Sequence, residues 1–270
     1  MNRGRAEIKT TGTARAVFFT ACVAVFSAVA AGPSTRFEIG GCNVDLFSSK
    51  ANVAPVVTFG GRTMQFAYRT DGILFDGEKS VPMHSFPTNG LAVLRETARE
   101  IRAEYVHTLY IGAETNATVV GTASNEVVFV AGGIGVRVTL YPEFPGRYRF
   151  RWKQKASQVI VFPEFKKWIG TTLESENLAG FRHMNLLPPH SEFDPHAWGM
   201  NTREAGEARK IWFGNVPDVW TLSAAEGAAF TVNHYTGGFE LGAVALNEDA
   251  MHTPAWDRPF TYNYAIRLEK

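Results

Sequence analysis

Apolar and polar residues alternate most regularly between Gly135 and Lys153, in two runs separated by Pro142-Glu143-Phe144-Pro145-Gly146. Side chains of a strand alternate between the two faces of a sheet, so in the second run the aromatic and the cationic residues lie on opposite faces. The aromatic residues are Tyr148, Phe150 and Trp152, and the cationic residues are Arg147, Arg149, Arg151 and Lys153. Two alternating runs around a Pro/Gly turn predict an antiparallel hairpin. Its aromatic face needs a second layer, which predicts a β-sandwich.

Similar patterns predict further strands before and after this hairpin. Residues 36–39 predict an edge strand, and residues 53–77 predict three short strands with turns at Gly60-Gly61 and at Asp71-Gly72. Pro and Gly predict a loop over 79–90. The charged stretch 95–104 is compatible with a helix, but the alternation from Ile101 to Ile111 favours strands. Strand patterns continue at 118–122 and 126–131, separated by Ser124-Asn125, and at 159–162, 210–213, 219–222, 228–234, 239–246 and 260–268.

The first thirty residues have the pattern of an export signal. A basic leader is followed by an apolar run from Ala16 to Ala31, with small residues at Ala28 and Ala30. This pattern predicts a secretory signal peptide over 1–30 and a secreted or periplasmic protein. An uncleaved anchor is the alternative, although a spanning helix needs about 20 apolar residues. Residues 31–270 contain no linker or repeat and are expected to form one domain, free of the membrane after signal cleavage.

Charge and cysteine content narrow the classes of function. Removal of residues 1–30 takes away four Lys/Arg and one Glu, which leaves 23 basic against 25 acidic side chains. This balance argues against nucleic acid as a partner. Only Cys42 remains, so an internal disulfide is excluded. Gly132-Gly133-Ile134-Gly135 precedes a strand rather than a helix, and therefore does not predict a dinucleotide site.

The order of these segments resembles the galactose-mutarotase-like (aldose-epimerase-like) family. The resemblance lies in Gly60-Gly61-Arg62 after an early strand, in Pro87-Thr88-Asn89, in the strands from Ser124 to Trp152 and in the late Val219-Trp220. It implies an all-β fold, a large antiparallel β-sandwich called a supersandwich, that binds a mono- or oligosaccharide. The epimerases of this family use a His pair with a carboxylate, a constellation that this sequence does not match position by position.

The histidine-rich stretch 181–198 is the main candidate for chemistry. It contains His183, His190 and His196 with Glu192 and Asp194. Histidine titrates near neutrality and a carboxylate can orient it, which suits acid/base work on a sugar. The same residue types suit zinc, but no established metal spacing is present, so no metal or cofactor is assigned. A solvated polar loop is the plain alternative.

Arginine and tryptophan residues are the candidates for substrate binding. Arg62 and Arg149 can hold substrate oxygens, and arginines at alternate positions of one strand match acidic groups of a glycan. Trp198 and Trp256 lie near predicted loops and are candidates for stacking on a sugar, whereas Trp152, Trp212 and Trp220 are expected to be structural.

These observations predict an exported carbohydrate-binding β-sandwich, and they leave open whether it is an enzyme. An enzyme would catalyse sugar epimerisation or lyase-type proton abstraction, with His183, His190 or His234 as the base. The alternatives are a non-catalytic glycan-binding or surface-interaction module, and a structural envelope protein. An enzyme is expected to bring two titratable groups with opposite pKa shifts into one pocket.

Overall fold

The computed structural model describes residues 36–39, 42–45, 56–59, 62–65, 69–86, 91–113, 116–150, 154–162, 172–178, 182–186, 208–215, 218–235, 238–246 and 253–269. Every regular element within these ranges is a β-strand, and the strand pairs are antiparallel. The prediction of a large antiparallel β-sandwich is confirmed. The signal peptide predicted over 1–30 lies outside the described residues. The described residues contain no helix that is long and apolar enough to cross a membrane.

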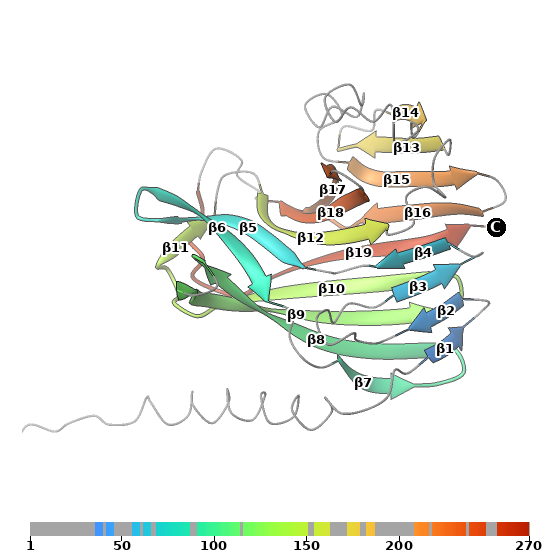
Figure 1. Cartoon of the computed structure of the whole chain (residues 1–270), viewed down its shortest axis with the longest axis horizontal. Helices are drawn as coiled ribbons and strands as arrows, with labels where there is room; N and C mark the ends of the chain where they lie inside the picture. The colour runs from blue at the N-terminus through green and yellow to red at the C-terminus, as the bar shows by residue number, and fades with distance from the viewer. Residues whose placement is uncertain are drawn as a thin grey trace, which may run out of the picture.

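The first layer is a broad sheet of consecutive antiparallel pairs (Figure 1). Its strands, in spatial order, are β14 (Arg182–Leu186), β13 (Thr172–Asn177), β15 (Ala208–Asn215), β16 (Asp218–Ala224), β19 (Phe260–Glu269), β10 (Gly133–Pro142), β9 (Thr118–Val130), β8 (Glu100–Ile111) and β7 (Leu91–Glu96). Strand β10 lies in the middle of this sheet and is hydrogen-bonded on both sides.

The second layer lies against the first, and in Figure 1 its strands pass in front of β8, β9, β10 and β19. Its strands, in spatial order, are β1 (Arg36–Ile39), β2 (Cys42–Asp45), β3 (Val56–Phe59), β4 (Arg62–Gln65), β12 (Gln154–Phe162), β18 (Gly238–Leu246) and β17 (Ala228–Tyr235). The predicted edge strand at 36–39 and the hairpin around Gly60-Gly61 are confirmed.

Three strands connect the two layers at one end of the molecule. Strand β5 (Thr70–Asp76) pairs with β12, with β6 (Lys79–Phe86) and with the short β11 (Tyr148–Phe150). Strand β6 in turn pairs with β8 of the first layer. The turn between β5 and β6 has Gly77 at φ 63°, a left-handed conformation that glycine adopts without steric cost.

One hydrophobic core fills the space between the layers. The inward residues of β8 alternate as the sequence predicts, with Ile101, Ala103, Tyr105 and Leu109 buried. Side chains of the second layer, among them Val57 and Met64, belong to the same cluster. Burial of each large apolar side chain stabilises the folded state by about 1.5–3 kcal/mol, so the core is the main force holding the layers together.

The hairpin predicted over residues 135–153 does not exist as a strand pair. Strand β10 pairs with β9 and β19, whereas β11 pairs with β5. The turn after Pro142 therefore carries the chain away from β10. The predicted faces are nevertheless confirmed where they are described: Val136, Val138, Leu140, Tyr148 and Phe150 are buried.

Two other predicted breaks are continuous strand, and a predicted loop contains a strand. Asp71-Gly72 lies inside β5, where a Cβ on Gly72 would be 2.8 Å from Met83 Cε and 3.0 Å from the Lys155 carbonyl oxygen. The glycine there permits close packing rather than a turn. Ser124-Asn125 lies inside β9, and β6 occupies most of the loop predicted over 79–90.

Candidate functional site

The outward-facing residues of β9, β10 and β19 form cross-strand rows on the first layer. Residues directly opposite each other in an antiparallel pair project from the same face. The register defines three consecutive rows, which are Val130–Gly133–Arg267, Val128–Gly135–Ala265 and Glu126–Arg137–Asn263. The middle row consists of two apolar residues and a glycine, whereas each outer row contains a charged or polar side chain.

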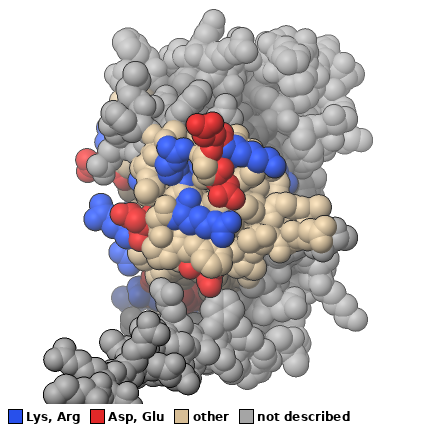
Figure 2. Space-filling model, turned by 90° about the vertical axis from the view of Figure 1, so that its left-hand side faces the viewer, with Lys and Arg blue, Asp and Glu red and all other residues tan. Residues whose placement is uncertain are grey.

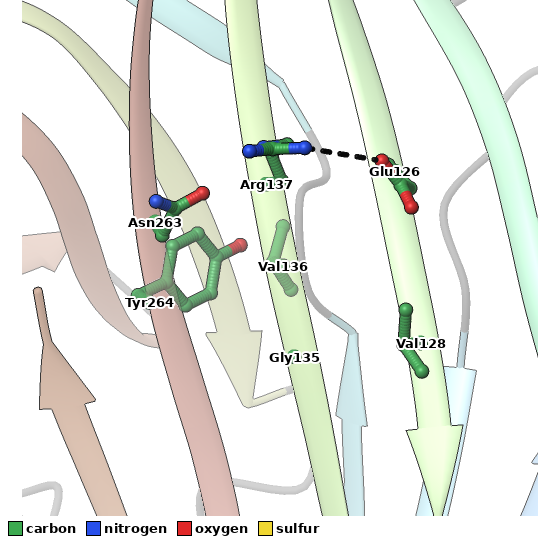
Figure 3. A pocket seen from close by; sticks show the side chains of 7 residues that line it. All are labelled: Glu126, Val128, Gly135, Val136, Arg137, Asn263 and Tyr264. Carbon is green, nitrogen blue, oxygen red and sulfur yellow. Dashed lines mark ion pairs between the residues drawn. The ribbon is translucent and has the colours of Figure 1, made fainter. Parts of the chain in front are cut away.

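The middle row is the floor of a hollow, which we call the β10 furrow. A Cβ on Gly135 would meet no heavy atom within 4 Å. A cavity of about 260 Å³ lies here, lined by residues of β9, β10 and β19 (Figure 3). The furrow exists because a glycine in the interior of a strand leaves open the space that a side chain would fill.

The Glu126 end of the furrow is held by ion pairs. Arg102 Nη1 lies 3.2 Å from Glu126 Oε1, and Arg137 Nη1 lies 3.9 Å from Glu126 Oε2. The dashed line in Figure 3 marks an ion pair between Glu126 and Arg137. The Arg137 side chain is 63% exposed, so its guanidinium also faces solvent. Asn263, on the opposite strand, adds an amide to this end.

Arg267 lies in the row next to the floor of the furrow, on the side away from Glu126. Its Cγ would lie 3.5 Å from a Cβ on Gly133, so its aliphatic stem covers that glycine. Val130 covers Gly133 from the other side, with its Cγ2 at 3.6 Å from the same position. The Arg267 side chain is exposed, and no ion pair of Arg267 occurs within the described residues.

The row of Arg267 continues onto the next two strands. Arg267 lies opposite Thr221 of β16, which in turn lies opposite Trp212 of β15. Trp212 is half-buried on this outer face, and Lys210 Nζ lies 6.0 Å from the centre of its ring. The surface beside the furrow therefore offers an aromatic side chain and a second cation.

These groups suit a ring that has one apolar face and many hydroxyl groups. The floor of Val128, Gly135 and Ala265 presents apolar surface. The rim provides a carboxylate that accepts hydrogen bonds, guanidinium groups that donate them and an amide that does both. Such a mixture of an apolar floor with a few polar groups is typical of small-molecule sites.

A second polar cluster lies inside the sandwich and joins its layers. The Gln158 amide of β12 donates to Asn125 Oδ1 of β9, and the Tyr264 hydroxyl of β19 donates to Gln158 Oε1 at 3.0 Å. Asn125 also donates to the carbonyl oxygens of Tyr105 and Ala123. We call this cluster, together with Thr70 and His107, the interior network.

His107 is the titratable group of the interior network. It is fully buried, and its Nδ1 lies 3.1 Å from Thr70 Oγ1. Desolvation by burial lowers the pKa of His107 from 6.5 to about 4, and burial raises the pKa of the Tyr264 hydroxyl. Both groups are therefore neutral near pH 7. Because these side chains are inaccessible to solvent, we assign the network to the fold rather than to a site.

A third polar cluster lies on the outer face of β5 and β6. Arg69 Nε donates to Asp71 Oδ2 at 2.6 Å, and His84 Nδ1 lies 3.6 Å from Asp71 Oδ1. The His84 side chain is 48% exposed and its ring is 6.0 Å from that of Tyr110. The described residues contain no group of three or more His, Cys, Asp or Glu side chains that could hold a metal ion.

The predicted catalytic residues lie on separate strands or outside the described residues. His183 is on β14, opposite Ser175 of β13, and His234 is on β17, opposite Phe239 of β18. Strands β14 and β17 belong to different layers. His190 lies outside the described residues, as do Glu192, Asp194 and His196. Catalysis by these histidines stays a prediction.

The predicted substrate-binding residues are also dispersed. Arg62 lies on β4, opposite Phe59, and Trp198 is outside the described residues. Trp256 is 1% exposed and packs on Phe150, with ring centroids 5.1 Å apart, which is a core position. Trp256 does not line the β10 furrow.

The end of the molecule formed by β5, β6 and β11 presents a surface of mixed charge (Figure 2). Arg149 is an exposed residue of β11. Its Nη2 donates to the Gly77 carbonyl oxygen at 2.6 Å, and its guanidinium lies 5.9 Å from the centre of the Phe75 ring. Arg147 Nη2 lies 3.6 Å from Asp76 Oδ2. The arginines that are described here therefore stabilise the turn between β5 and β6.

The furrow residues were not among the sequence candidates. The signal that identifies them is Gly135, a glycine within a strand that otherwise alternates apolar and polar residues. Such a glycine marks a bulge, a bend or a site where something approaches the backbone. The residues around it come from three strands, and only the register of β9 and β19 on β10 brings them together.

No protein-family model matches this chain, and no curated protein matches it by sequence. Solved structures match at low identity. An α-mannosidase from Enterococcus faecalis V583 aligns over 88% of this chain and 30% of its own, with 10% identity and a TM-score of 0.53. The chain thus spans about a third of the length of that protein.

Two further matches have lower TM-scores. A putative aldose 1-epimerase from Escherichia coli K12 aligns over 88% of this chain and 99% of its own, with 8% identity and a TM-score of 0.44. An α-N-acetylgalactosaminidase from Bifidobacterium bifidum aligns over 87% and 36%, with 12% identity and a TM-score of 0.48. The antiparallel β-sandwich that the resemblance implies is confirmed by the strand pairing and by the match to the α-mannosidase.

Proposed function

We propose that this protein binds carbohydrate and that the β10 furrow is its binding surface. The observation that carries the proposal is the open space over Gly135, which has an apolar floor and a rim of Glu126, Arg137 and Asn263. A pyranose has an apolar C–H face and a periphery of hydroxyl groups, so the two are chemically complementary. The α-mannosidase that shares the fold is named for a carbohydrate substrate, which agrees with this proposal.

Gly135 allows a direct test of the furrow. Replacement by leucine fills the hollow, and the absence of any heavy atom within 4 Å of a Cβ means that the fold can accept a side chain there. We expect Gly135→Leu to abolish saccharide binding in calorimetric titration while the melting temperature stays within a few degrees of the wild type. Ser80→Leu is the matched control, because it adds the same side chain at an exposed strand position near the Gly77 turn.

Two results would contradict the proposal. The first is unchanged saccharide binding by Gly135→Leu, which would place the site elsewhere on the molecule. The second is the absence of a thermal shift with any neutral or acidic saccharide, since a ligand that binds only the folded state must raise the melting temperature.

Export and catalysis extend this proposal. We propose that residues 1–30 direct export. The test is mass spectrometry of protein recovered from outside the cytoplasm. A measured mass that lacks residues 1–30 supports the proposal. Catalysis by His183, His190 or His234 on a sugar is tested with alanine variants of each histidine. Epimerase or lyase activity that persists in all three variants would exclude this set of bases.

A further inference from the structure

We infer that the saccharide recognised by the β10 furrow is acidic, and that the Arg267 guanidinium binds its carboxylate. This inference rests on the proposed function and adds a ligand class to it. Three features support it: the position of Arg267, the ion pairs of the arginines at the opposite end of the furrow, and an aromatic ring, that of Trp212, along the same face.

Arg267 lies in the row next to that of Gly135, on the same face of the sheet. Its stem crosses Gly133, with Cγ at 3.5 Å from the Cβ position of that glycine. Gly133 and Gly135 lie two residues apart on the same strand, about 7 Å along the sheet. A ligand over Gly135 that extends by one row along the strands therefore reaches Arg267.

The charge of Arg267 is uncompensated within the described residues. Glu269, two residues further along β19, and Glu100, opposite Val130, are the nearest carboxylates by register, and no ion pair joins either to Arg267. Guanidinium groups bind carboxylates through two parallel hydrogen bonds, stronger than those between neutral groups. An acidic ligand provides this missing partner.

The arginines at the Glu126 end, unlike Arg267, form ion pairs within the described residues. Arg102 and Arg137 both pair with Glu126, and Arg102 Nε also lies 3.8 Å from Glu100 Oε1. A ligand carboxylate at that end would approach Glu126 and be repelled by it. The two ends of the furrow therefore differ in charge. Hydroxyl groups fit the Glu126 end, and a carboxylate fits the Arg267 end.

The same face continues towards a further cation. Lys210 of β15 lies opposite Ser223 of β16, which lies opposite Ala265 in the row of Gly135. Three strand spacings separate Gly135 from Lys210, about 14 Å. Trp212 lies in the adjacent row and can stack on a sugar ring. An acidic oligosaccharide that crosses the strands from Gly135 would meet Arg267 and then the ring of Trp212. Lys210 lies opposite Glu176 of β13, so Arg267 is the cation on which the inference depends.

The test compares oligosaccharides of equal length that differ in charge. The mature protein is titrated calorimetrically with a neutral maltotriose, with tri-galacturonate and tri-mannuronate, and with a sulfated trisaccharide. We expect a uronate to bind at least about tenfold more tightly than maltotriose, and Arg267→Gln to reduce the ratio of the two affinities to about one. The preference should shrink as salt rises, since exposed charges are screened.

Controls separate this inference from the proposed function. Arg258→Gln removes an exposed arginine just before β19, at the opposite end of that strand, and should leave the preference unchanged. Equal binding of uronate and maltotriose, both lost in Gly135→Leu, would overturn the inference and keep the proposed function. A preference that survives Arg267→Gln, or one limited to the sulfated trisaccharide, would also overturn it. Binding of any of these saccharides that Gly135→Leu leaves intact would overturn the proposed site itself.

Discussion

Gln158 donates a side-chain hydrogen bond to Asn125, and this contact crosses the interior from the second layer to the first. Both side chains are fully buried, and Gln158 additionally accepts from Tyr264. The two layers are therefore joined at their centre by directional bonds and not only by apolar contact. Buried directional bonds between the layers favour one relative position of the two sheets.

Gln158→Leu should destabilise the fold by about 2–4 kcal/mol, because it leaves Asn125 Oδ1 and the Tyr264 hydroxyl buried without this partner. Urea unfolding measures the difference. Thr139→Ala is the matched control, since it removes a hydroxyl pair with Thr261 that is exposed to water and should cost under about 0.5 kcal/mol. Equal losses for the two variants would contradict the assigned role of the network.

Acid should destabilise the protein through His107. Its folded-state pKa is about 4 and its unfolded-state value about 6.5, so the unfolded chain binds the proton first as the pH falls. The contribution of neutral His107 is complete above pH 6.5 and falls progressively between pH 6.5 and 4. The total loss is about 3 kcal/mol, at about 1.4 kcal/mol per pH unit.

The pH effect is measured by urea unfolding at pH 7, 5.5 and 4.5. His107→Gln removes the titrating group, so its stability should fall less steeply over this range than that of the wild type. Carboxylates titrate equally in both proteins and cancel in the comparison. Parallel pH profiles would show that His107 is not responsible.

Gly121→Ala should destabilise the fold by at least about 1 kcal/mol. A Cβ there would overlap the Tyr141 carbonyl oxygen and would lie 2.5 Å from Trp256 Cη2. Gly135→Ala is the matched substitution within the same sheet, where the Cβ meets no atom within 4 Å, and it should be close to neutral. Thermal unfolding distinguishes the two, and a neutral Gly121→Ala would refute the packing of Trp256 described above.

Arg149→Met should cost about 0.5–1 kcal/mol of stability. The substitution keeps apolar contact with Phe75 but removes the hydrogen bond to the Gly77 carbonyl oxygen. The chemical denaturation midpoint measures this loss. No change in stability, together with weakened saccharide binding, would instead support the substrate-binding role predicted from the sequence.

Local alternation predicted the faces of strands but not their partners. The pattern from Ile101 to Ile111 places His107 inside the sandwich, as the structure confirms. The partner of β10 was predicted wrongly, because the two runs around Pro142 have compatible patterns whether or not they pair. Two short polar signals were also misleading. Asp71-Gly72 fits a turn, but close packing against Met83 accounts for the glycine, and hydrogen bonds to buried Gln158 allow Asn125 inside a strand.

The candidate site was less predictable than the fold for a physical reason. Histidine and tryptophan have chemistry that can be recognised in a sequence, which is why the sequence indicates His183, His190 and Trp256 as site residues. The furrow is instead defined by a missing side chain at Gly135 and by groups from distant parts of the chain, such as Glu126 and Asn263. A single glycine does not predict a binding site, because the residues around it follow from the register of the strands on both sides.

The pairing of β10 with β19 also determines when the fold can be completed during synthesis of the chain. The strand that supplies Ala265, Asn263 and Arg267 to the furrow, and Tyr264 to the interior network, is made long after β10 itself. Contacts between residues so far apart in sequence form slowly, because the intervening chain loses conformational entropy before the contacts stabilise it. A nascent chain that ends before residue 260 has neither the second wall of the furrow nor the Tyr264 bond between the layers. A truncated product that ends there is therefore expected to be unstable.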